Sequence, residues 1–212
     1  MIITLLSQNL SLLPEHAVFW HEQKTLVLAD IHLGKTYTFR RAGIPVPEGA
    51  LETDLQRINS LIQTFNAQRC IIVGDLFHAR SGFTASSLLQ IENGLKALPI
   101  PLDLVLGNHD RSLKHISTEN WNMHIHPESL LIPPFAFTHE PKSLENFYTW
   151  SGHIHPYILI KHLKTHLRLP CFVLKENYAI LPAFGSFVGG KSISKDPKAS
   201  LYAIYENNVI KL

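Results

Sequence analysis

Five short blocks of acidic, imidazole and amide side chains recur along this sequence of 212 residues. In chain order they are Asp30-Ile31-His32, Gly74-Asp75-Leu76-Phe77-His78, Gly107-Asn108-His109-Asp110, Thr138-His139-Glu140 and Gly152-His153-Ile154-His155. Carboxylate, imidazole and amide-oxygen ligands together suit borderline divalent cations such as manganese, iron or zinc. No cysteine belongs to a block, which argues against a structural zinc site. The residue types therefore predict a metal centre of another kind.

The spacing within the first and last blocks suits a shared ion. Residues two apart in an extended segment point to the same side, so Asp30 and His32 can face one metal, as can His153 and His155. The glycine before three of the blocks lets the backbone turn sharply there. Each block alone has an ordinary alternative, such as a turn or a solvated hairpin end. All five together favour the metal centre.

The segments that precede the first three blocks have the apolar composition of buried strands. We predict strands over residues 25–29, 70–73 and 102–106, alternating with amphipathic helices over 48–65 and 86–98. This alternation predicts right-handed parallel crossovers. Since open α/β sheets bind ligands at the carboxyl ends of their strands, the first three blocks should meet at one edge.

The second half of the chain is rich in short β-like stretches separated by turn signals, among them Asn207-Asn208 as a tight hairpin. A parallel α/β half followed by an antiparallel β half predicts two packed sheets with helices outside, in a single domain over residues 1–212. The expected strands of the second half are 135–138, 147–151, 157–161, 171–174, 178–181, 201–205 and 209–212.

Composition narrows the class of protein. The hydrophobic fraction of 45% and charged fraction of 17% are those of a globular chain. A net charge of +2 permits an anionic partner without demanding one. Cys70 and Cys171 lie in apolar runs, as reduced core thiols do. With no secretory signal and no apolar run near the roughly 20 residues that span a bilayer, we expect a soluble, cytoplasmic protein without a membrane partner.

The five blocks resemble the signature of the calcineurin-like metallophosphoesterases, which is D-x-H, G-D-x-x-[DH], G-N-H-[DE], an isolated His and G-H-x-H. They stand intact and in that order from Asp30 to His155. The resemblance implies an α/β fold, a four-layer αββα sandwich of two mixed β-sheets flanked by helices, and a site for two divalent metal ions at one edge. We expect Mn²⁺, with iron or zinc as alternatives.

The resemblance also assigns roles to individual residues. It implies that Asp75 bridges the two metals and that His109, which binds no metal, contacts phosphate and protonates the leaving oxygen. His78 occupies a variable position of its block and is a candidate substrate contact. The protein phosphatases of this family have G-D-x-V-D-R-G where this chain has Gly74-Asp75-Leu76-Phe77-His78-Ala79-Arg80, so a protein phosphatase is disfavoured. The implied ligands are Asp30, His32 and His155 for one metal and Asn108, His139 and His153 for the other.

A second resemblance concerns the stretch after the first block, Phe39-Arg40-Arg41-Ala42-Gly43-Ile44-Pro45-Val46-Pro47-Glu48-Gly49. It is similar to bacterial phosphoesterases associated with DNA ligase and repair helicase genes, and implies a manganese-dependent DNA endonuclease or phosphodiesterase. DNA would then be the partner, with DNA ligase or a repair helicase as protein partners. The alternative interpretation of residues 33–47 is a Pro-rich connection that shapes the rim of the site.

The substrate stays open between two enzyme classes. The leading hypothesis is a DNA phosphodiesterase, and the alternative is a pyrophosphatase or phosphodiesterase for a nucleotide or nucleotide-linked lipid. A non-catalytic scaffold should lack ligands, and none is missing. Arg40 and Arg111 are the candidate phosphate contacts, with Lys35 and Arg41 as further cations near the blocks. The Gly- and Ser-rich residues 185–195 receive no function from sequence.

Overall fold

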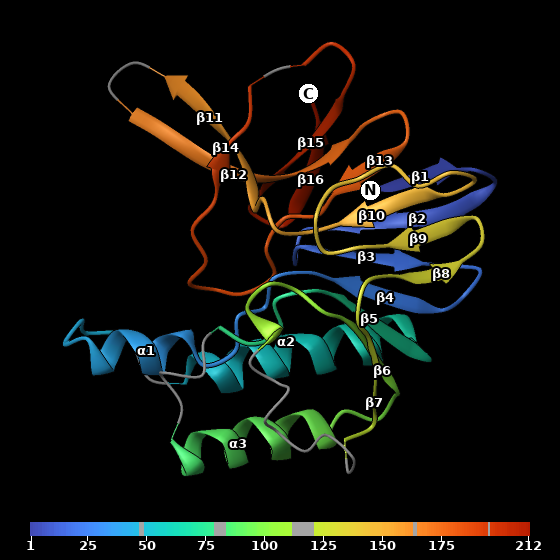
Figure 1. The fold of residues 1–212 in the computed structure, drawn as a ribbon. Helices are drawn as coiled ribbons and strands as arrows, with labels where there is room; N and C mark the ends of the chain where they lie inside the picture. Colours follow the sequence, from blue (N-terminus) through green and yellow to red (C-terminus); the bar gives the residue numbers. More distant parts are fainter. Residues whose placement is uncertain (47–48, 79–83, 112–120, 163–164, 195) are drawn as a thin grey trace.

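The computed structural model describes residues 1–46, 49–78, 84–111, 121–162, 165–194 and 196–212. Two β-sheets pack face to face, and the helices lie along the outer face of one of them (Figure 1). No helix among the described residues is long and apolar enough to cross a membrane.

Among the described residues, the first sheet has seven strands in sequence order. The first four are antiparallel and the last four are parallel, with β4 shared between the two parts. Parallel pairing puts the carboxyl ends of β4, β5 and β6 at one edge. The strands are β1 (Ile2–Leu5), β2 (Gln8–Leu13), β3 (Ala17–Trp20), β4 (Thr25–Leu28), β5 (Arg69–Val73), β6 (Leu102–Val105) and β7 (Met123–His126).

Among the described residues, α2 (Ala50–Phe65) and α3 (Ala85–Lys96) lie along the face of the first sheet that points away from the second, and α1 (Lys35–Arg41) lies to one side of them (Figure 1). In α2 an apolar stripe packs on the sheet. In α3 the first turn is capped reciprocally by Thr84 and Ser87, which satisfies two backbone donors of the helix start.

The second sheet is mixed. Strand β9 pairs parallel to β10, which pairs parallel to β13, whereas β12 pairs antiparallel to β11, β13 and β15. Its strands are β8 (Leu130–Ile132), β9 (Phe135–Phe137), β10 (Tyr148–Ser151), β11 (Pro156–His162), β12 (Thr165–Leu174), β13 (Tyr178–Ile180), β14 (Lys191–Ser192), β15 (Ser200–Tyr205) and β16 (Asn208–Lys211).

Alternation along the strands divides the core into layers. Between the sheets, residues such as Trp20, Phe135 and Phe172 form one apolar cluster. The neighbouring positions Cys171 and Val173 point to the opposite face of the second sheet and join a smaller cluster there. Both cysteines are free and buried, as the sequence predicts.

The predicted sandwich of two mixed sheets is confirmed. The three parallel strands and both helices of the first half are also confirmed. Their observed ends lie within two residues of the predicted ends wherever the structure describes the end. Residue 48, the expected start of α2, lies outside the described residues. One expectation is wrong: the second half is not simply antiparallel, since β9, β10 and β13 run parallel. Residues 35–41, which belong to the stretch 33–47, form helix α1.

Candidate metal centre

All the candidate ligands follow strands, and the strands end at one edge of the sandwich. The first sheet contributes the residues after β4, β5 and β6, and the second sheet contributes those after β9 and β10. The two sheets therefore meet at the site. In the order of these strands, the residues are Asp30 and His32, then Asp75 and His78, then Asn108 and His109, then His139, and finally His153 and His155.

Five of the candidate ligands have left-handed backbone conformations. This region is rare for residues other than glycine and costs of the order of 1 kcal/mol or more at each position. Such a concentration at one edge indicates that the surrounding contacts hold these side chains in place against local preference. The φ angles are 54° at Asp30, 52° at His32, 49° at Asp75, 68° at His153 and 49° at His155.

The glycines that precede the blocks make room for ligands. A Cβ on Gly107 would lie 2.2 Å from Asp75 Oδ1, and one on Gly152 would lie 2.5 Å from Asp30 Oδ2. Only Gly74 also has a positive φ, of 80°. The expectation that all three glycines serve a sharp turn is therefore corrected, because Gly107 and Gly152 are required by close packing against carboxylates.

The first set of candidate ligands, which we call the Asp30 group, consists of Asp30, His32 and His155. Asp30 is fully buried and accepts two hydrogen bonds from the backbone N–H of His153. His155 Nε2 lies 3.2 Å from Asp30 Oδ1. Nδ1 of His155 donates to the carbonyl oxygen of Gly189, which leaves the lone pair of Nε2 facing the carboxylate in the neutral ring.

The second set, the Asn108 group, consists of Asn108, His139 and His153. Asn108 Oδ1 lies 2.9 Å from His139 Nε2 and 3.1 Å from His153 Nδ1, and the two ring nitrogens are 3.1 Å apart. Nδ1 of His139 donates to the carbonyl oxygen of Val73, so its Nε2 presents a lone pair. Lone pairs that converge in this way fit a shared cation.

Asp75 lies between the two groups. Its Oδ2 is 3.8 Å from His32 Nε2 and 3.5 Å from His139 Nε2, while Oδ1 accepts a hydrogen bond from the backbone N–H of His109. Burial raises the pKa of Asp75. A carboxylate in this position can contact cations held by either group.

The buried polar atoms of the site fit a bound cation. Both ring nitrogens of His32 are buried without a hydrogen-bond partner among the described residues, and the side chain is 3% exposed. Burial, together with the neighbouring His155 and His109, lowers the pKa of His32 to about 2, so the ring is neutral and able to ligate. For His155, burial acts to lower the pKa, but the adjacent Asp30 outweighs it and the pKa is raised.

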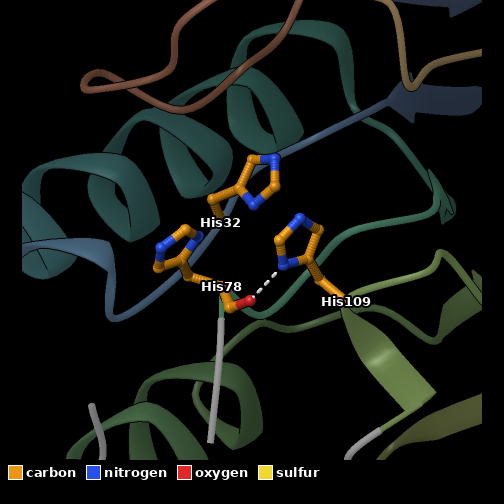
Figure 2. Close-up of side chains that lie close together, drawn as sticks. All are labelled: His32, His78 and His109. Atoms are coloured by element: carbon orange, nitrogen blue, oxygen red, sulfur yellow. Dashed lines mark hydrogen bonds between the residues drawn. The ribbon is translucent and has the colours of Figure 1, made fainter. Parts of the chain in front are cut away.

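His109 and His78 stand beside His32 (Figure 2). The two rings stack with centroids 5.3 Å apart, and Nδ1 of His109 donates to the carbonyl oxygen of His78. This bond keeps a proton on Nδ1 and leaves Nε2 of His109, 3.9 Å from Asp75 Oδ2, as the atom that can gain or lose one. Burial lowers the pKa of His78 to about 4, so its ring is neutral near neutral pH.

Sequence reasoning gave no role to Asp110. Its buried carboxylate accepts hydrogen bonds from the backbone N–H of Phe77 and of Gly107, and so ties the loops after β5 and β6 together. Burial raises its pKa to about 6. Its place in the third block was the only signal available.

The segment 185–190, unassigned from sequence, packs against the ligand backbone. A Cβ on Gly185 would lie 2.1 Å from the Ile31 carbonyl oxygen, and one on Gly190 would lie 2.1 Å from the His155 carbonyl oxygen. Together with the Gly189 carbonyl that orients the ring of His155, this segment forms one wall of the site.

The predicted cations lie in different places. Arg111 lines a cleft of about 480 Å³ that also includes Asn108 and His139. Lys35 lines a small cavity with His32. Arg40, on α1, lines a separate cavity that contains none of the candidate ligands, so a substrate contact there stays a prediction.

The sequence profile described as "Calcineurin-like phosphoesterase" matches residues 23–187. Comparison with curated protein sequences gives no match. The crystal structure of Pseudomonas putida nuclease MPE has 31% identity and a TM-score of 0.83, over 100% of this chain and 99% of that one.

Two other solved structures are less similar. The phosphoesterase Yfce from E. coli has 15% identity and a TM-score of 0.46, over 89% of this chain and 97% of that one. The protein AQ665 from Aquifex aeolicus, of unknown function, has 18% identity and a TM-score of 0.43, over 62% and 77%.

Proposed function

Because the chain belongs to the calcineurin-like phosphoesterase family and is a metal-dependent phosphoester hydrolase, we propose that it cleaves phosphodiester bonds in DNA with two bound manganese ions. The observation that carries this proposal is the similarity to a nuclease over the full length of both chains. The placement of the candidate ligands around Asp75 supports it. A role in DNA repair, with DNA ligase or a repair helicase as partner, rests on the resemblance of residues 39–49 alone.

In this proposal the Asp30 group would hold one cation and the Asn108 group the other, and Asp75, which lies between the groups, would serve both. Two such cations, when bound, polarise the phosphoryl oxygens and make hydroxide available near neutral pH. The protein contributes position, because strained backbone and buried carboxylates fix the ligands before substrate arrives. His109 supplies a proton to the leaving oxygen from Nε2, since its Nδ1 is committed to the His78 carbonyl.

The test compares hydrolysis of bis-p-nitrophenyl phosphate with nicking of a supercoiled plasmid, both with Mn²⁺. Asp75→Asn should reduce both rates by roughly a thousandfold or more, because both groups lose their shared carboxylate. His109→Ala should reduce plasmid nicking by about a hundredfold or more, and the nitrophenyl reaction less, because nitrophenolate leaves without a proton.

His124, an exposed histidine on β7, provides the control, and His124→Ala should leave both rates unchanged. Undiminished diester hydrolysis in Asp75→Asn would refute the two-metal mechanism. A wild-type enzyme that hydrolyses the nitrophenyl diester but leaves DNA intact would instead indicate the small-molecule phosphodiesterase.

A further inference from the structure

A cavity of about 170 Å³ opens beside His155. Its walls include His16, Tyr157, Arg168 and the loop at Gly189. No carboxylate side chain of the described residues lines it, whereas the cleft beside Asn108 has Glu128 and Glu140 in its wall together with Arg111 and Lys142. The cavity beside His155, with a cation and no carboxylate among the described residues, therefore suits an anion.

Arg168 is the cation of this cavity. Its guanidinium carbon lies 3.7 Å from the centroid of the Tyr157 ring, close enough for a cation–π contact that orients the planar group. Among the described residues, no carboxylate lies within 4.0 Å of it. An arginine held flat on an aromatic ring, with its N–H edge left available, suits bidentate binding of a phosphate.

One glycine separates Arg168 from the candidate metal ligand. The position of a Cβ on Gly190 would lie 3.1 Å from Arg168 Nη2 and 3.1 Å from His155 Cβ. The guanidinium therefore lies near the Cβ of His155, one member of the Asp30 group.

The segment 184–190, which forms part of the wall of this cavity, is held by contacts with helix α2. The buried Asp54 of α2 accepts a hydrogen bond of 2.6 Å from the hydroxyl of Ser186. Arg57, also of α2, donates to the Phe184 carbonyl oxygen and stacks on the Phe184 ring at 4.2 Å. The loop that carries Gly189 is thus a fixed surface.

We propose that Arg168, stacked on Tyr157, binds the phosphate next to the scissile one on a polynucleotide strand, with the adjoining cavity receiving the nucleoside between them. This inference rests on the proposed function and adds to it that the substrate extends past the reacting phosphate on the His155 side. It also assigns a role to residues 185–190.

The experiment compares two substrates, because bis-p-nitrophenyl phosphate has no neighbouring phosphate and a single-stranded oligonucleotide has one. Arg168→Ala should lower kcat/KM for the oligonucleotide by about tenfold or more, chiefly through KM, and leave the nitrophenyl reaction within twofold of wild type. Arg168→Lys should be intermediate, since it keeps the charge without the planar donor pair. Lys211, which lies over the ring of Tyr202 on the β15–β16 hairpin, is the matched control, and Lys211→Ala should change neither rate.

A binding measurement separates a phosphate contact from a structural effect. Anisotropy of a fluorescent single-stranded oligonucleotide, measured in EDTA over a range of salt concentrations, should show the slope of log K against log salt reduced by about 0.7 in Arg168→Ala. An unchanged slope, or equal losses on both substrates, would overturn the assignment of Arg168. Failure of wild type to cleave or bind any oligonucleotide would overturn the proposed function and this inference together, whereas loss confined to the variant leaves the proposed function intact.

Discussion

The two groups of candidate ligands differ in how their polar atoms are satisfied. In the Asp30 group, Asp30 is 0% and His32 4% exposed, and neither ring nitrogen of His32 has a hydrogen-bond partner among the described residues. In the Asn108 group, Asn108 and His153 are exposed, and their polar atoms contact each other and His139. The Asp30 group thus contains buried ring nitrogens without hydrogen-bond partners among the described residues, whereas two residues of the Asn108 group are exposed and the polar atoms of that group contact one another.

This difference predicts that the two groups have different roles, one in metal affinity and the other in access to substrate. Burying a polar atom without a partner costs about 1–3 kcal/mol, so the Asp30 group destabilises the metal-free fold and gains most from a bound cation. The Asn108 group loses little without metal and faces the larger cleft, where Arg111 also lies. We expect the first group to bind metal more tightly and the second to be more accessible to substrate.

The largest effect should come from crowding the carboxylates. Gly152→Ala would place a methyl group 2.5 Å from Asp30 Oδ2, and Gly107→Ala one 2.2 Å from Asp75 Oδ1. Since displacing a catalytic group by about 1 Å can cost about a hundredfold in rate, both variants should lose at least that much diester hydrolysis. His124→Ala, at an exposed position of β7, is the control. Activity in Gly152→Ala equal to that of the control would break the close-packing argument.

The next effect concerns metal affinity. A cation at a hundred times its Kd should raise the unfolding free energy by about 2.7 kcal/mol per site. Asp30→Asn should remove more of the Mn²⁺-induced stabilisation than Asn108→Ala, because it deletes a buried negative charge instead of a neutral amide. Urea unfolding at a series of Mn²⁺ concentrations measures this, with metal-free protein of each variant as its own reference. A greater loss in Asn108→Ala would reverse the assigned order of affinity.

The part of the site that sequence predicted is the part fixed by local chain geometry. A buried strand followed at once by Asp30, Asp75 or Asn108 places a ligand at a strand end whatever surrounds it. The parallel strands were readable for the same reason, since strands buried on both faces are continuous apolar runs.

The rest depended on contacts between distant residues. Strands β1, β2 and β3 precede β4 in the chain and form an antiparallel extension of the first sheet. No apolar–polar alternation in the sequence distinguished them. Helix α1 has only one buried residue, Thr36, and so carried no apolar periodicity. The role of residues 185–190 follows from close packing: a Cβ on Gly185 or Gly190 would lie about 2 Å from the backbone carbonyl oxygen of Ile31 or His155. No pattern of residue types in the sequence indicates such contacts.

The smallest expected effect is a change in stability, and it measures the cost of burying the His32 ring nitrogens without hydrogen-bond partners. His32→Leu and His153→Leu both place leucine at a positive φ, of 52° and 68°, so the backbone strain of the substitution is similar in the two variants. They differ in burial, because His32 is buried and His153 exposed. At pH 8 in EDTA, both imidazoles are neutral when unfolded, and removing the two unsatisfied nitrogens should make His32→Leu more stable than His153→Leu by about 1–2 kcal/mol.

Both variants should nevertheless lose diester hydrolysis with Mn²⁺, because each lacks a ligand. Chemical denaturation gives the stabilities, and the same protein samples give the rates. A variant that gains stability in EDTA while losing activity identifies a residue kept for metal binding at the expense of the fold. If His32→Leu were instead less stable than His153→Leu, the nitrogens of His32 would already be satisfied in the metal-free protein, and the contrast between the two groups would not be one of buried polar cost.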